Sequence, residues 1–155
     1  MYCVCMKEES FSKLCSIWNR IGPFNMDSFS DRLILQKKVF LLKEGGFDIG
    51  YGFNKYIRGP YSPVLANDGY KINSGEIVSG NAPLSEEIIK KLHNIEKGHE
   101  GEALWFELVT SILYCIKKEG LSIKECKEKL IEEKPHLDMD EFDEAIKKLS
   151  ENSFI

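Results

Sequence analysis

The sequence predicts a mainly α-helical fold: a compact helical domain of about six to seven helices with a short β-ribbon. Three observations support this class. Apolar residues recur at helical spacing in several segments, serine or aspartate precedes many of these segments, and glycine or proline often follows them. Of the 155 residues 43% are apolar, enough for a core, but no apolar run approaches the roughly 20 residues of a membrane helix. We therefore expect a cytoplasmic protein without a membrane partner.

The first third of the chain predicts two helices and a short extended piece. Residues 7–20 carry one apolar stripe that ends at a Gly-Pro pair. Residues 29–44 follow Ser28, a suitable N-cap, and end at a glycine pair. Their apolar residues lie on more than one side, which predicts a central helix with several neighbours. Residues 53–57 predict an extended piece that pairs with a strand at residues 76–78, in a ribbon resembling the wing of a winged helix.

The stretch "GPYSPVLANDGYKI" predicts a sharp turn that leads into a helix. The Gly-Pro pair forms the turn, and the helix covers about residues 63–71, with Ser62 as N-cap and Pro63 at the first helical position. Backbone geometry thus explains the glycine and the prolines of this stretch. It leaves Arg58 and Tyr61 as candidates for contacts with another molecule.

The second half predicts four helices. They span residues 86–96, 102–118, 123–133 and 139–151, with N-caps at Ser85, Ser122 and Asp138. Ser122 and Glu125 have the spacing of a capping box. The last three helices follow the order of a helix-turn-helix module, but the exposed face of the final helix is acidic and would repel phosphates. We therefore expect that helix to pack rather than to read DNA.

Charge is distributed unevenly along the chain, which we treat as one domain of residues 1–155. Residues 1–83 have a net charge of +2 and residues 84–155 a net charge of −6, within a total of −4. The acidic second part would repel a polyanion, so any nucleic-acid surface should lie in the first part. All three arginines are in the first part as well.

The sequence lacks the common motifs of catalysis and metal binding. G-x-S-x-G and H-E-x-x-H do not occur, and no Cys-His pair is brought together by the sequence, so we assign no catalytic residue, cofactor or metal. The five cysteines are an odd number without framework spacing and are expected to be free thiols. His93 and His99 flank the segment "NIEKG" and are expected at a solvated helix end rather than in a ligand set.

An aromatic and basic cluster is the candidate partner-binding site. Its members are Lys55, Tyr56, Arg58, Tyr61 and Tyr70. Tyrosine and arginine are enriched in protein interfaces, and both also stack on nucleic-acid bases. The alternative interpretation is packing, with the tyrosines half-buried and Arg58 bound to a loop carbonyl.

Two segments carry a family resemblance: "LQKKVFLL" at residues 35–42 and "FNKYIRGPYSPVLANDGY" at residues 53–70. Together they resemble the YwgA-like proteins and, more distantly, the Panacea or SocA-like antitoxin domain. The shared signature falls on Leu35, Gln36, Lys37, Gly59, Pro60 and Pro63. The chain departs from the antitoxin pattern at Tyr61, where that domain usually has a small aliphatic residue, and in its acidic C-terminal part.

The resemblance implies a helical cytoplasmic protein without catalysis. Panacea-type domains neutralise toxins by direct binding, and the SocA-like member also acts as a proteolytic adaptor. We therefore expect an antitoxin- or adaptor-like interaction protein that binds a protein partner, with a toxin among the candidates. The alternatives are a winged-helix-like DNA-binding transcriptional regulator and an enzyme whose class the motifs do not identify. The sequence is also compatible with a homo-oligomer.

Overall fold

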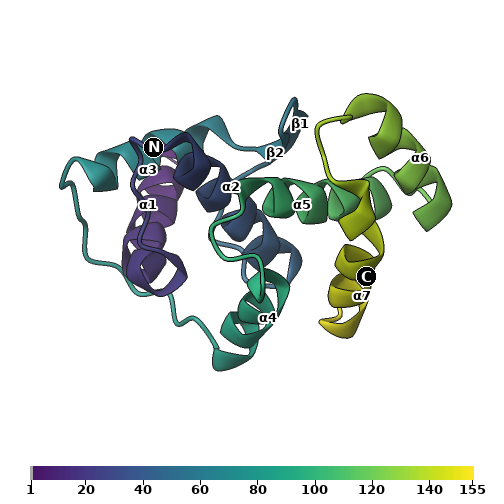
Figure 1. Cartoon of the computed structure of the whole chain (residues 1–155). Coiled ribbons are helices and arrows are strands. Elements are labelled where there is room, and N and C mark those ends of the chain that lie inside the picture. The colour runs from purple at the N-terminus through teal and green to yellow at the C-terminus, as the bar shows by residue number, and fades with distance from the viewer. Residues whose placement is uncertain (1) are drawn as a thin grey trace.

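The computed structural model describes residues 2–155, with side chains from Glu8 onward. Over these residues the chain forms seven α-helices, one 3-10 helix and a two-stranded antiparallel sheet (Figure 1). The elements are α1 (Tyr2–Ile21), α2 (Phe29–Glu44), β1 (Asn54–Tyr56), β2 (Gly59–Tyr61), α3 (Pro63–Asn73), α4 (Glu86–Glu96), α5 (Ala103–Lys117), α6 (Ile123–Glu133), the 3-10 helix η1 (Met139–Glu141) and α7 (Phe142–Glu151). The predicted fold class, mainly helical with a short β-ribbon, is confirmed.

Helix α5 runs across the middle of the molecule, with α1 and α3 on one side and α6 and α7 on the other (Figure 1). It packs against α2, β2, α6 and α7. Every residue from Trp105 to Leu113 is buried, because α5 is surrounded by neighbours on all sides. Helix α2 contacts α3, α4, α5 and β2, so the predicted central position of this helix is also confirmed.

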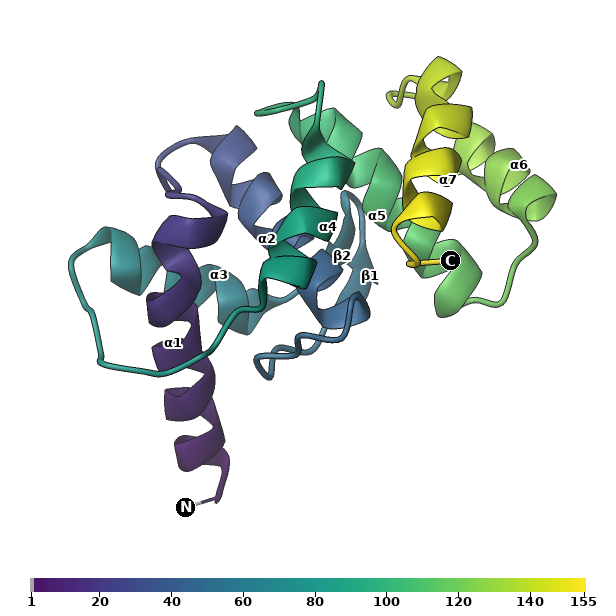
Figure 2. The ribbon, with the colours of Figure 1, turned by 90° about the horizontal axis from the view of Figure 1, so that it is seen from below.

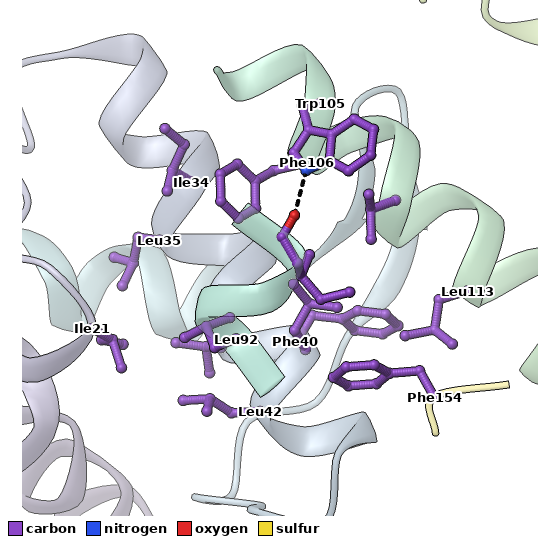
Figure 3. Close-up of a cluster of buried hydrophobic side chains, with 14 of the residues drawn as sticks. Ile21, Ile34, Leu35, Phe40, Leu42, Leu92, Trp105, Phe106, Leu113 and Phe154 are labelled. Atoms are coloured by element: carbon purple, nitrogen blue, oxygen red, sulfur yellow. Dashed lines mark hydrogen bonds between the residues drawn. The ribbon is translucent and has the colours of Figure 1, made fainter. Parts of the chain in front are cut away.

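A single apolar cluster joins the helices. Figure 3 shows Ile21 of α1, Leu35 of α2, Leu92 of α4 and Trp105 of α5 facing the same interior. The indole Nε1 of Trp105 donates a hydrogen bond to the carbonyl oxygen of Ile95 at 2.9 Å, which satisfies the one polar group of this side chain. Removal of apolar surface from water, worth roughly 25 cal/mol per Å², is the main source of stability for such a core.

Side-chain caps form the predicted helix starts. Ser28, Ser62, Ser85 and Ser122 each accept a hydrogen bond from the backbone N–H three residues later. Ser122 and Glu125 complete the predicted capping box. Each cap contributes about 1 kcal/mol, so local chemistry determines where these helices begin. The last predicted helix is divided, because the 3-10 turn η1 precedes α7.

The β-ribbon differs from the prediction in its second strand. β1 pairs with β2 in a tight hairpin that turns at Ile57 and Arg58. The predicted partner strand at residues 76–78 is wrong, because this segment is exposed and forms no strand. Gly59 follows the turn with a φ of +92°, a conformation that suits glycine. The turn thus precedes the Gly-Pro pair, and Pro60 lies within β2.

The segment of residues 74–85 crosses α1 on its way from α3 to α4 (Figure 2). Gly80 makes this crossing close: a Cβ at this position would lie 2.3 Å from the carbonyl oxygen of Ser12 in α1. Because contacts below about 3 Å require a shift of the backbone, a residue without a side chain is needed at this point.

Two further features bear on the predictions. No helix in the described part of the chain is long and apolar enough to cross a membrane. Cys15, Cys115 and Cys126 are free thiols, whereas the side chains of Cys3 and Cys5 lie outside the described ones.

Candidate protein-binding surface

A groove lies between the start of α2, the β-hairpin and α3. It encloses about 140 Å³ and is lined by Met26, Phe29, Arg32, Leu33, Gln36, Tyr61, Ala66 and Tyr70. Tyr61 and Tyr70, two of the predicted partner-binding residues, therefore line the same groove. We refer to these eight residues as the aromatic groove.

Phe29 forms an exposed rim of the aromatic groove beside two arginines. Its side chain is 55% exposed, which is unusual for a phenylalanine. The guanidinium carbons of Arg32 and Arg58 lie 5.5 Å and 5.8 Å from the centroid of the Phe29 ring, within cation–π distance. Arg32 also donates through Nη1 to the carbonyl oxygen of Met26 at 2.9 Å. Among the side chains from Glu8 onward, no carboxylate forms an ion pair with Arg32.

The two tyrosines of the hairpin support each other. The rings of Tyr56 and Tyr61 meet edge to face, with centroids 5.2 Å apart and planes at 65°. Tyr56 and Tyr70 are each 47% exposed, and Tyr61 is half-buried. Tyr56 and Tyr61 thus combine a fixed position with an accessible surface, and Tyr70 adds further exposed aromatic area.

Arg58 lies at the hairpin turn above a buried carboxylate. Its side chain is 44% exposed, and its Nη1 lies 3.8 Å from Oε1 of Glu107, which is completely buried. The other carboxylate oxygen of Glu107 accepts hydrogen bonds from Nζ of Lys134 at 3.1 Å and from Nε2 of His136 at 2.7 Å. Because 3.8 Å is too long for a hydrogen bond, Glu107 orients Arg58 through charge without occupying its N–H donors.

Lys55 lies outside the aromatic groove. Its Nζ is 3.2 Å from a carboxylate oxygen of Glu133 and 3.6 Å from one of Glu119. These contacts connect β1 to α6 and the turn before it. The structure therefore separates Lys55 from Tyr61 and Tyr70.

The signature residues support the aromatic groove from inside. The side-chain amide of Gln36 exchanges two hydrogen bonds with the backbone of Ser62, with N–O distances of 2.9 Å and 2.8 Å. The ammonium group of Lys37 donates to the carbonyl oxygen of Pro60 at 2.7 Å. Leu35, Gln36 and Lys37 are at most 1% exposed, Gly59 and Pro60 are buried in β2, and Pro63 is the first residue of α3. The signature thus fixes the hairpin on α2.

Among the buried residues that hold the hairpin, Lys37 has a strongly lowered pKa. Burial lowers its pKa to about 7, while the charge of Glu107 opposes this shift and the charge of Lys134 adds to it. A lowered lysine pKa is common in catalytic sites. In this conformation, however, the Lys37 side chain is completely buried and serves as an internal donor to the hairpin.

Sequence reasoning missed three residues of this region. Glu107 could have been identified from the sequence, because it is the single charged residue in the apolar run "ALWFELVTSILYCI". A charged residue in such a run is expected to be buried together with partners. Phe29 and Arg32 had no such signal, because they reach the hairpin only through the packing of α2 against it.

Comparisons of the chain with protein-family models, with curated proteins and with solved structures found no match. The resemblance to YwgA-like and Panacea-type proteins is thus a proposal that rests on the signature residues alone.

Proposed function

We propose that this chain is a non-catalytic interaction protein, antitoxin- or adaptor-like, that binds a protein partner through the aromatic groove. The observation that carries the proposal is the exposure of Phe29 between Arg32 and Arg58. Aromatic and arginine side chains supply most of the binding energy in protein interfaces when they lie in a well-supported pocket. The hydrogen bonds of Gln36 and Lys37 to the hairpin provide that support.

The charge at the rim of the aromatic groove, from Arg32 in the groove and Arg58 beside it, indicates the kind of partner segment. Arg32 and Arg58 both lie beside the Phe29 ring, at 5.5 Å and 5.8 Å from its centroid, on a chain whose net charge is −4. A segment that carries an aspartate or glutamate beside an apolar side chain would pair with the guanidinium groups and fill the space next to Phe29. Arginine can bind a carboxylate through two parallel hydrogen bonds, which would fix the orientation of the partner segment as well as add affinity.

DNA binding has less support. A wing-like hairpin contacts phosphates through unpaired cations, but Lys55 on β1 already lies between the carboxylates of Glu119 and Glu133. The first turn of α7 carries Asp143 and Glu144, which would meet phosphate oxygens with like charge. A protein partner therefore agrees better with the charges of the described surface.

The test is a binding experiment with a purified partner. Proteins retained by the chain from its native host are identified by mass spectrometry, and one is purified for calorimetric titration. Phe29→Ala and Arg58→Ala should each weaken binding at least about tenfold, since hot-spot residues cost more than about 1.4 kcal/mol. Ile131→Ala is the matched control, because Ile131 on α6 is 53% exposed, close to the 55% of Phe29.

Three outcomes would contradict the proposal. Equal affinity of both variants and the control would remove the aromatic groove from the interface. Failure of any purified protein to bind would remove the partner class. Binding of duplex DNA with an affinity that falls by about 10³-fold or more between roughly 50 and 200 mM salt would replace the proposal with the DNA-binding regulator.

A further inference from the structure

A polar cluster outside the aromatic groove lies where the loop after α4 meets α7. His99 lies in this loop and contacts three glutamates. Its Nδ1 is 2.7 Å from Oε2 of Glu102 and 3.3 Å from Oε2 of Glu141, and its Nε2 is 2.8 Å from Oε2 of Glu144. The expectation of a solvated His99 is wrong, because only 9% of this residue is exposed.

The ring of His99 is held in a fixed orientation. It stacks on the indole of Trp105, with ring centroids 3.8 Å apart and planes within 8° of each other. Trp105 is itself buried and bonded to the backbone of α4. The glutamates come from three places in the chain, at the start of α5, at the end of η1 and in the first turn of α7. The imidazole is therefore positioned before any ligand arrives.

Both ring nitrogens of His99 face carboxylate oxygens, so the cluster favours a positive charge. A neutral imidazole has one N–H group, and its donation from Nε2 to Glu144 leaves a lone pair on Nδ1. That lone pair faces carboxylate oxygens of Glu102 and Glu141, an arrangement that is repulsive unless a positive species lies between them. Either a second ring proton or a metal ion removes the repulsion. Three carboxylates around one ring favour the larger charge of a divalent ion.

We propose that Nδ1 of His99 and the carboxylates of Glu102 and Glu141 bind a divalent cation of the zinc class. The three ligand atoms lie within 4.8 Å of one another, and Nδ1 of His99 and Oε2 of Glu102 would separate slightly from their present hydrogen-bond distance to hold one ion. One imidazole and two carboxylates form a three-ligand set with an open fourth position for water. Glu144 acts as the positioning residue, because a carboxylate on the far ring nitrogen fixes the tautomer of a metal-binding histidine.

Metal binding at this place would connect the C-terminal helix to the core. Glu141 and Glu144 belong to η1 and α7, whereas His99 and Glu102 belong to the connection between α4 and α5. Lys148, which lies beside the stacked indole, is directed elsewhere: its Nζ donates to the carbonyl oxygen of Lys97 and lies 5.2 Å from the Trp105 ring centroid. The cluster thus keeps an excess of negative charge that a divalent ion would balance.

The experiment is calorimetric titration of the full chain with zinc chloride and, in parallel, optical titration with cobalt(II). Cys3 and Cys5 are replaced by serine in every sample, because a C-x-C pair can bind zinc by itself. We expect one bound ion per chain, a cobalt spectrum without a sulfur-to-metal charge-transfer band, and a melting temperature that rises with metal concentration. His99→Gln and Glu141→Gln should each weaken binding more than about tenfold, and Glu144→Gln should weaken it by about 10- to 100-fold.

Asp143→Asn is the matched control, since Asp143 is an exposed carboxylate in the same turn as Glu144, and this variant should bind zinc like the parent chain. Circular dichroism of each metal-free variant separates loss of ligand from loss of fold. Absence of saturable binding to the parent chain would show that a proton alone occupies the cluster and would overturn the proposal. Equal affinity of the parent and His99→Gln, or a charge-transfer band from sulfur, would overturn it as well.

Discussion

The buried amine of Lys37 makes a quantitative prediction about stability and pH. Its pKa is about 7 in the folded protein and 10.5 in an exposed lysine. Because the folded pKa is depressed, the folded state loses this proton before the unfolded state does. The contribution of Lys37 is therefore complete above pH 10.5 and is lost as the pH falls to about 7. Between about pH 6 and pH 9 the linkage relation gives an increase in the free energy of unfolding of up to about 3 kcal/mol.

The variant for this test is Lys37→Met, which keeps an unbranched chain of similar length and does not titrate. The free energy of unfolding is measured in urea at pH 6 and at pH 9, with the fluorescence of Trp18 and Trp105 as the signal. The parent should gain stability relative to the variant as the pH rises, because the other titrating groups are common to both proteins. Lys90→Met removes an exposed lysine of α4 and should show no such pH-dependent difference. A difference between parent and Lys37→Met that is the same at both pH values would refute the reasoning.

Two further predictions concern how the hairpin and the 74–85 segment are held. Gln36→Leu should lower the free energy of unfolding by about 1–3 kcal/mol, because it leaves the N–H of Ser62 buried without a partner, while the carbonyl oxygen of Ser62 keeps the N–H of Ala66. A loss below about 0.5 kcal/mol in urea unfolding would contradict this role. Gly80→Ala should lower it by about 1–3 kcal/mol, because the new methyl group meets the Ser12 backbone. Gly52→Ala is the control, since nothing lies within 4 Å of a Cβ there, and equal effects of the two alanines in thermal unfolding would disprove the close crossing.

Helix positions were predictable because their signals are local. A serine cap such as Ser85 and a helix-ending glycine such as Gly45 act within one turn of backbone, so the sequence places α2 and α4 at their observed bounds. Strand pairing has no such local signal. Residues 76–78 have strand-like composition, but β2 forms instead at Gly59–Tyr61, because the tight hairpin turn brings that segment next to β1. The proline in β2 also argues against a strand when it is considered alone.

The candidate sites likewise contain residues that local sequence indicates and residues that only tertiary packing brings together. Tyr61 and Arg58 could be selected from sequence because they are close together in the chain and have no explanation from backbone geometry. Phe29 and the glutamates around His99 could not be selected, since only tertiary packing brings them to their neighbours. Apolar periodicity predicts which side of a helix is buried. It does not predict which polar side chains from different helices come into contact.

The positions of the signature residues change what the family resemblance can mean. Gln36 and Lys37 bind the backbone next to or in the hairpin and are at most 1% exposed, so they act mainly on the scaffold, although Gln36 also lines the aromatic groove. Phe29 and Tyr70, which are exposed in the aromatic groove, do not belong to the signature. A protein could therefore keep the signature, and with it the hairpin on α2, while its groove residues change to suit another partner. In the proposed resemblance the signature residues would therefore describe the scaffold, whereas the charge and shape of the aromatic groove would select the partner.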